Sequence, residues 1–286
     1  MTGRPHLPPE PFFLDRPDGS RRFCLLHAPA GSRAAGCVLY LHPFAEEMNK
    51  ARRMAALQSR AFAAEGLAVL QIDLLGCGDS SGDFGDASWA AWVDDGLAAS
   101  RWLRERYAGA PLWLWGLRAG TLLAQAVHRQ LQAPAHLLYW QPTPSGKQHL
   151  QQFLRLKRAA AIAGTDAGAG GTTLPPTPRA LLDRGEPVEV GGYWLSPALA
   201  SGLDGATLAP PTAPAPGTRL VWVEQGDGTE PAPASATVLR DWAVAGVQPE
   251  VHVVAAPPFW QTVEVEEAPA FIAASTAAIP GAGSPP

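Results

Sequence analysis

The side chain that most constrains the chemistry of this chain is Arg118, at the tip of a glycine-bracketed corner. The segment 111–127, PLWLWGLRAGTLLAQAV, passes from a short apolar run through GLRAG into a helical pattern. Glycine permits a tight turn from strand to helix, and the residue at its tip projects from the end of the sheet. A serine, cysteine or aspartate there would be a nucleophile. A guanidinium has no usable lone pair and a pKa above about 12, so Arg118 cannot attack an acyl carbon.

An arginine at the start of a helix needs a negative partner, because it opposes the helix dipole by roughly 0.3 to 1 kcal/mol. One interpretation is a bound phosphate, carboxylate or sulfate, held by Arg118, by backbone N–H groups of the corner and by the loop after His42. The residues expected to line this anion site are Gly116, Leu117, Ala119, Gly120, Pro43, Phe44 and Glu46. The alternative is an internal ion pair, and the two can coexist. Its acidic candidates are Glu46, Glu47, Glu65, Asp73, Asp79, Asp83, Asp86, Asp94 and Asp95.

Cys77 offers a second route to catalysis. It lies in the glycine-rich segment 73–86, DLLGCGDSSGDFGD, and His42 is expected at the same end of the sheet. A thiol beside an imidazole would form a nucleophile with its base. The alternative interpretation is a small side chain in a tight turn, with His42 stabilising the neighbouring loop. Glu46 or Glu47 could instead activate a water molecule directly.

The groups that assist a nucleophile are incomplete. No histidine follows His252, which itself lies in a predicted strand. Asp227 and Glu230, in GDGTEP, are the candidates for the acid, but an acid without a base has nothing to orient. The aspartates of 79–86 lack the terminal glutamate of a twelve-residue calcium loop, so they indicate a solvated acidic loop. We predict no metal site and no cofactor.

Alternating strands and helices must position these side chains. Apolar runs typical of strands covered on both faces occupy 37–42, 67–73, 112–115, 136–140, 220–224 and 250–255, after a hairpin formed by 12–14 and 22–28. Helical patterns occupy 51–65, 88–107, 119–131, 234–245 and 266–274. This alternation predicts an α/β fold with a mostly parallel, doubly wound sheet, whose ligands bind at the carboxyl ends of its strands.

An insertion interrupts the alternation. We expect the first part of the core over 1–141, a partly flexible lid insertion over 142–216, the second part of the core over 217–276 and a disordered tail over 277–286. The lid begins with a basic helical stretch. Its basic residues are Lys147, His149, Arg155, Lys157 and Arg158. Either this stretch meets an anionic glycan or lipid-linked headgroup, or its apolar side packs on the core while its basic side is simply in water.

Composition limits the function classes. The chain has 286 residues, 47% of them hydrophobic, and a formal charge of -4, which argues against an electrostatic nucleic-acid binder. No apolar run approaches the roughly 18 residues of a membrane span, and the amino end lacks the pattern of a signal peptide. The three cysteines form no CxxC pair, so neither a disulfide framework nor a zinc site is indicated. We expect a cytoplasmic protein.

The order and spacing of HPFAEEMNKARRM, DLLGCGDSSGDFGD and GLRAG resemble the α/β-hydrolase superfamily, from about residue 12 to 274. These strings, with WQPTPSGKQHLQQFLRL and PFWQTVEVEEAP, are also similar to the bacterial group named hydrolase 2, exosortase A system-associated. The closer resemblance implies a cytoplasmic protein with an α/β-hydrolase fold, and a genomic neighbourhood of exopolysaccharide and exosortase genes. It leaves open a pseudoenzyme that binds a small anionic, acyl or glycan ligand, or partner proteins of that system. It leaves open equally an active hydrolase of ester, thioester or acyl bonds, and a scaffold that binds nothing small.

Overall fold

The computed structural model describes residues 7–29, 33–164, 176–211 and 214–279. Within them, an eight-stranded sheet has the order β1-β2-β4-β3-β5-β6-β9-β10. Its strands are β1 (Glu10–Asp15), β2 (Arg21–His27), β3 (Gly36–Leu41), β4 (Leu67–Ile72), β5 (Leu112–Leu117), β6 (His136–Trp140), β9 (Leu220–Gln225) and β10 (Glu250–Val254). β1 pairs with β2 and β2 with β4 in antiparallel fashion, and every later pairing is parallel. The predicted hairpin and the mostly parallel sheet are therefore confirmed.

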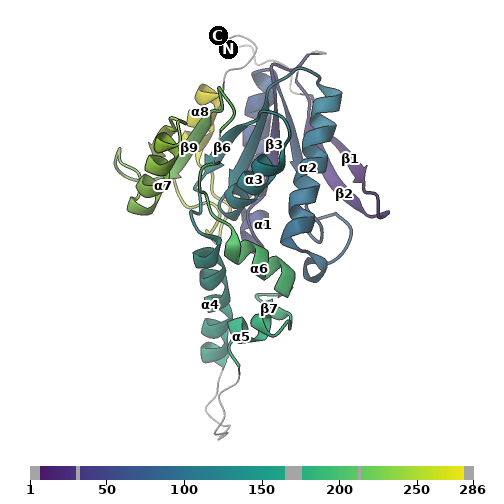
Figure 1. Ribbon diagram of the computed structural model, residues 1–286, viewed down its shortest axis with the longest axis vertical. Helices are drawn as coiled ribbons and strands as arrows, with labels where there is room; N and C mark the ends of the chain where they lie inside the picture. The colour runs from purple at the N-terminus through teal and green to yellow at the C-terminus, as the bar shows by residue number, and fades with distance from the viewer. Residues whose placement is uncertain (1–6, 30–32, 165–175, 212–213, 280–286) are drawn as a thin grey trace, which may run out of the picture.

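Helices cover both faces of this sheet (Figure 1). They are α1 (Glu46–Ala64), α2 (Trp89–Arg106), α3 (Ala119–Gln130), α7 (Pro233–Val244) and α8 (Pro269–Ala278). Side chains of α1 and α8 share one buried cluster with one face of the strands, and those of α2, α3 and α7 share a second cluster with the other face. The central strands β3 and β5 are buried along their whole length, which is why their sequences are unbroken apolar runs.

The insertion lies between β6 and β9. It contains α4 (Gly146–Gly164), α5 (Pro178–Asp183), β7 (Val188–Val190), β8 (Tyr193–Leu195) and α6 (Pro197–Gly205). In Figure 1 these elements form a separate layer below the sheet and its helices. The hairpin of β7 and β8, together with α6, occupies a stretch in which the sequence indicated only an insertion. Gly146 starts α4 where an added Cβ would lie 1.8 Å from the Leu203 carbonyl oxygen, so α4 and α6 meet too closely for another residue there.

Some boundaries differ from the predictions. α1 begins at Glu46, five residues before the helical pattern, so Glu46 and Glu47 lie in its first turn and not in a loop. α8 continues to Ala278, into the segment predicted as a tail. The remainder of that tail, 280–286, and the glycine-rich part of the insertion, 165–175, lie outside the described residues. None of the helices in the described ranges has the length and apolarity needed to cross a membrane.

Candidate functional site

The corner between β5 and α3 holds Arg118 in an unusual backbone conformation, with φ 54° and ψ −123°. A side chain at positive φ is strained by about 1 to 3 kcal/mol, and such strain gathers at functional sites. The glycines on either side of Arg118 are required because a larger residue would collide with neighbouring backbone. A Cβ on Gly116 would lie 2.5 Å from the Gly120 carbonyl oxygen, and one on Gly120 would lie 2.3 Å from that of Leu41. The chain thus turns sharply enough to leave Arg118 at the carboxyl end of the sheet.

A second corner of the same shape lies on the neighbouring strand. Ala45, between β3 and α1, has φ 51° and ψ −127°, close to the values of Arg118. Because Gly120 packs against the carbonyl oxygens of Leu41 and His42, the amino ends of α1 and α3 lie next to each other. The unpaired N–H groups at two helix amino ends create a region of positive potential.

An open cleft of about 410 Å³ lies over these corners. α1 and the loop before it, the corner of α3, the lid helix α4 and the segment after β10 all contribute to it. The lining residues are Phe44, Ala45, Glu46, Glu47, Lys50, Arg118, His149, Gln152, Phe153, Leu156, Trp260 and Gln261. The anion-site prediction named Arg118, Phe44 and Glu46, which line this cleft, together with Pro43, Gly116, Leu117, Ala119 and Gly120, which are buried at its corners.

Arg118 has an internal partner in this cleft. Its Nε donates a hydrogen bond to Glu47 Oε1 at 3.2 Å, so Glu47 is the acid of the ion pair. The guanidinium also lies 5.8 Å from the ring centre of Trp260. Burial raises the pKa of Glu47, and the charge of Arg118 opposes that rise. Among the described residues, neither Nη of Arg118 has a hydrogen-bond partner, and neither is enclosed by protein.

His149, which the sequence indicated only as one of the basic residues of the lid, lines the cleft. It belongs to the first turns of α4 and is only 6% exposed, so it does not lie on a solvated side of that helix. Within the described residues its Nδ1 is enclosed without a hydrogen-bond partner. Burial, assisted by the charge of Arg118, lowers the pKa of His149 to about 3, so the imidazole is neutral near pH 7. Spacing could not reveal it, because the lid is placed only by tertiary contacts.

His42 and Cys77 lie at the same end of the sheet, in separate structural roles. His42 Nδ1 donates to the Pro43 carbonyl oxygen at 2.8 Å, and its Nε2 accepts a long contact of 3.4 Å from the Leu74 N–H. These bonds join the corner after β3 to the loop after β4. Cys77 is 6% exposed, and burial together with the charge of Asp73 raises the pKa of its thiol. No hydrogen bond joins Cys77 to His42 within the described ranges, and neither side chain lines the cleft.

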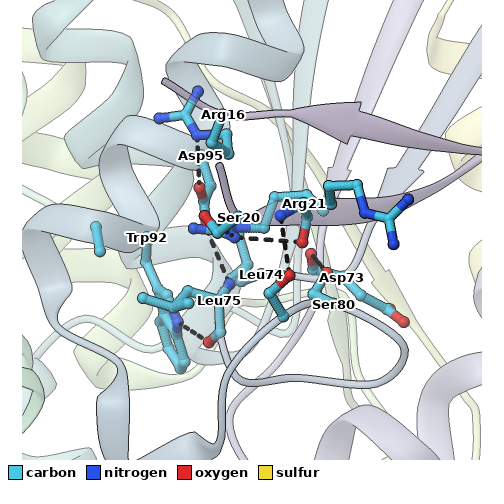
Figure 2. Close-up of polar contacts among 12 residues, drawn as sticks. Arg16, Ser20, Arg21, Asp73, Leu74, Leu75, Ser80, Trp92 and Asp95 are labelled. Carbon is cyan, nitrogen blue, oxygen red and sulfur yellow. Dashed lines mark hydrogen bonds and ion pairs between the residues drawn. The ribbon is translucent and has the colours of Figure 1, made fainter. Parts of the chain in front are cut away.

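The loop after β4, which carries Cys77, is held by buried polar contacts (Figure 2). Asp95 of α2 accepts a hydrogen bond from the Leu75 N–H at 2.9 Å and one from Arg22 Nε at 2.7 Å, and it pairs with Arg16. A Cβ on Gly78 would lie 1.9 Å from Asp73 Oδ2, so the loop wraps tightly around that carboxylate.

Two further aspartates of this loop hydrogen-bond to the backbone of the loop itself. Asp83 and Asp86 cap the short helix η1 (Phe84–Asp86) through each other's backbone N–H groups. In the parts of the chain that the structure describes, no group of three or more acidic, histidine or cysteine side chains has the arrangement of a metal site. The loop therefore acts as a rigid support beside the cleft.

The acidic candidates after β9 lie apart from Arg118. Asp227 and Glu230 are both exposed, and neither lines the cleft. A different acid, Glu224, is buried in this region and accepts hydrogen bonds from Trp222 Nε1 at 2.8 Å and from the Ala232 N–H at 2.6 Å. Glu224 therefore fixes the loop that carries the exposed acids.

Comparisons with known proteins agree with this architecture. Residues 32–159, less than half of the chain, match the family described as serine aminopeptidase, S33. No curated protein matches the chain. One similar solved structure is Est1E from Butyrivibrio proteoclasticus with bound ferulic acid, at 15% identity over 85% of this chain and 89% of that chain, with a TM-score of 0.60.

Other solved structures are similar to this chain in fold. A thermostable carboxyl esterase from Bacillus coagulans is 13% identical over 87% of this chain and 90% of its own, with a TM-score of 0.58. A soluble variant of monoglyceride lipase from Saccharomyces cerevisiae is 17% identical over 87% of both chains, with a TM-score of 0.59. At these low identities the similarity establishes the fold, while function depends on the site. The chain has the α/β-hydrolase fold, as the resemblance implied.

Proposed function

We propose that this α/β-hydrolase-fold protein binds a small anion at Arg118 instead of forming an acyl-enzyme at the corner between β5 and α3. The observation that carries the proposal is the guanidinium itself. It lines an open cleft of about 410 Å³, and only its Nε has a hydrogen-bond partner among the described residues. The remaining N–H groups form a planar fork that suits a carboxylate, phosphate or sulfate.

The surroundings of Arg118 favour an added negative charge. Glu46 and Glu47 lie in the first turn of α1 and offset its amino end and the guanidinium in the free protein, whereas the first turn of α3, next to Arg118, carries no acid. The strained backbone of Arg118 and Ala45 keeps both corners turned toward the cleft. A ligand anion would therefore meet a cation and oriented N–H dipoles that need no rearrangement to receive it.

The resemblance to the exosortase A system-associated group supports a role for this binding in exopolysaccharide production or protein sorting. The ligand classes that this resemblance leaves open are small anionic, acyl and glycan ligands. Partner proteins of the same system are the other class of candidates for the cleft.

Thermal unfolding in the presence of anions tests the proposal. At a ligand concentration of about 100 Kd, binding adds about 2.7 kcal/mol of stability, which corresponds to a rise in Tm of several degrees for a chain of this size. We expect at least one anion from a panel of phosphate, sulfate, carboxylates, acyl phosphates and sugar phosphates to produce this rise. Arg118→Gln should abolish it. Arg101→Gln, which alters an exposed arginine of α2, should retain it. No rise with any anion would refute the proposal.

A second candidate function is hydrolysis by a water molecule that Glu47 activates. It is favoured by the position of Glu47 in the cleft and by the raised pKa of its carboxyl group, which makes it a stronger base. Glu47 would take a proton from water, the water oxygen would bond to the acyl carbon, and the leaving alcohol or thiol would receive the proton. Arg118 would stabilise the negative oxygen that forms.

A screen of p-nitrophenyl esters and acyl thioesters separates these functions. The anion-binding proposal predicts rates equal to those in buffer for the wild type, Cys77→Ala and Glu47→Gln. Activity that is lost in Glu47→Gln and kept in Cys77→Ala would establish the second candidate. Activity lost only in Cys77→Ala would establish the thiol route. Arg118→Ser should stay inactive, because the segment after β10 supplies no histidine to activate a serine, and His149 has no acid on its Nδ1 among the described residues to orient it.

A further inference from the structure

The cleft over Arg118 has an apolar wall that an anion alone would not use. His149, Gln152, Phe153 and Leu156 follow one another at helical spacing, so a single face of α4 lines the cleft. Phe44 stands perpendicular to Phe153 with ring centres 5.0 Å apart. Leu156 is 59% exposed at this face although it is a large apolar residue. A ligand with an apolar part would remove this surface from water.

The charges that line the cleft limit the charge of the ligand. Arg118 and Lys50 are cationic, Glu46 and Glu47 are anionic, and Glu47 already pairs with Arg118. The formal charges of these four lining side chains therefore sum to zero. A single negative charge can bind the free N–H groups of Arg118, whereas a dianion such as a phosphate monoester also meets two carboxylates in the same cleft.

His149, which lines the cleft together with Arg118, is a second polar side chain available to a ligand. It is 94% buried as judged from its 6% exposure, and its Nδ1 has no partner among the described residues. The less costly neutral tautomer keeps a bare lone pair on the enclosed Nδ1 and carries the proton on Nε2. A neutral N–H donor close to a guanidinium suits the two oxygens of one carboxylate.

We propose that the cleft selects a monocarboxylate attached to an aromatic or medium-chain acyl group. The carboxylate binds Arg118 and His149, and the apolar group lies against Phe44, Phe153, Leu156 and Trp260. This inference rests on the proposed anion binding at Arg118 and gives it a ligand class. Phosphate and sugar phosphates are the competing class.

Isothermal titration of the full chain with acetate, butyrate, hexanoate, octanoate and cinnamate tests the inference. Because a buried methylene contributes about 0.8 kcal/mol, we expect Kd to fall about two- to fourfold per methylene from butyrate to octanoate. Cinnamate should bind at least tenfold more tightly than acetate. Cinnamamide, which has the same shape without the charge, should bind at least tenfold more weakly than cinnamate.

Two variants locate the ligand. Arg118→Gln should raise the Kd of octanoate at least tenfold. Leu156→Ser changes an exposed residue, so it should fold, and it should weaken octanoate severalfold while leaving acetate unchanged. Val244→Ser is the matched control, because Val244 is an exposed valine of α7 that does not line the cleft. It should leave octanoate binding unchanged.

The outcomes that oppose the inference differ from those that oppose the proposed function. If inorganic phosphate or glucose 6-phosphate binds more tightly than octanoate and loses affinity in Arg118→Gln, the monocarboxylate class is wrong while anion binding stands. A Kd that does not change with chain length, or octanoate binding that survives Arg118→Gln, also overturns the inference. If neither class of anion binds the wild type, the inference and the proposed function both fail.

Discussion

The guanidinium of Arg118 can bind Glu47 within the protein and an anion from solution. Its Nε is bound to Glu47, and the remaining N–H groups face the cleft. A mostly buried pair of this kind contributes little net stability, because desolvation offsets most of the attraction between the charges. The same pair lowers the attraction of Arg118 for a second anion. Glu47 is thus a built-in competitor of any ligand that binds the guanidinium.

Glu47→Gln tests this competition. The substitution keeps the shape of the side chain and removes its charge, so we expect the Kd of the best anion to fall threefold to tenfold. Titration calorimetry at pH 7 measures the change. Glu46→Gln is the control, because Glu46 contacts Tyr193 and Asn49 instead of Arg118 and should change the Kd less. Weaker anion binding in Glu47→Gln would mean that Glu47 orients the guanidinium for the ligand and does not compete with it.

The sequence revealed Arg118 more readily than its neighbours in space. A glycine-bracketed corner is a local pattern, so the residue at its tip could be identified from the chain alone. His149 and Trp260 reach the cleft from the lid and from the segment after β10, which no local pattern positions. Glu47 was one of many acidic candidates, and only the structure pairs it with Arg118.

At the scale of the elements, the amino end of α3 packs closely against the ends of β3 and β5, and only small residues fit at the contact. Gly120→Ala tests this packing. The added Cβ would lie 2.3 Å from the Leu41 carbonyl oxygen, and backbone cannot move aside cheaply. We expect the free energy of unfolding in urea to fall by at least about 2 kcal/mol, at the upper end for overpacking.

Gly205→Ala is the matched control for Gly120→Ala. Gly205 ends α6, has no heavy atom within 4 Å of an added Cβ and does not have positive φ. This substitution should change the stability by less than about 1 kcal/mol. Equal effects of the two substitutions would show that the close approach of α3 to β3 does not constrain the corner.

The loop after β4 is held by Asp95 (Figure 2), whose side chain is 1% exposed. Asp95→Ala leaves the buried guanidinium of Arg22 without its anion and the Leu75 N–H without its acceptor. We expect a loss of roughly 3 to 5 kcal/mol, as for other broken buried pairs. Arg16→Ala removes a more exposed partner at 3.4 Å and should cost about 1 kcal/mol or less. Urea unfolding measures the loss of stability in both variants. A larger loss in Arg16→Ala than in Asp95→Ala would contradict the central role of Asp95.

Over the whole molecule, periodicity was enough to predict the sheet and most of its helices. Parallel strands buried on both faces leave unbroken apolar runs, and amphipathic helices leave helical spacing, so β3 to β6 and α2 to α3 could be located to within a few residues. The elements of the lid could be predicted less well than those of the sheet. β7 and β8 are only three residues each, so local pattern could not specify them. The helical stretch that begins the lid was predicted, but its place against α6 depends on tertiary contacts. The start of α1 was missed because its corner at Ala45 contains no glycine to mark it.

The last prediction concerns the response of the whole fold to acid. Burial lowers the pKa of five histidines, to about 4 for His27 and about 3 for His149, with the same direction at His42, His128 and His136. These imidazoles are neutral in the folded state but bind protons in the unfolded chain below about pH 6.5. The unfolded state therefore binds more protons, and the stability present above pH 6.5 is lost as the pH falls.

Buried acids have the opposite effect on stability. Burial raises the pKa of Glu47 and Asp95, so these groups favour the folded state as the pH falls. A substitution of His149 alone therefore measures the histidine effect separately from that of the acids. Between pH 7 and pH 5, His149 should account for about 2 kcal/mol of lost stability. Urea unfolding of the wild type and His149→Gln at pH 7, 6 and 5 measures it: the curve of the variant should be flatter by that amount, whatever its stability at pH 7. Parallel curves for the wild type and His149→Gln would mean that His149 is accessible to protons in the folded protein, and that the lid does not enclose it.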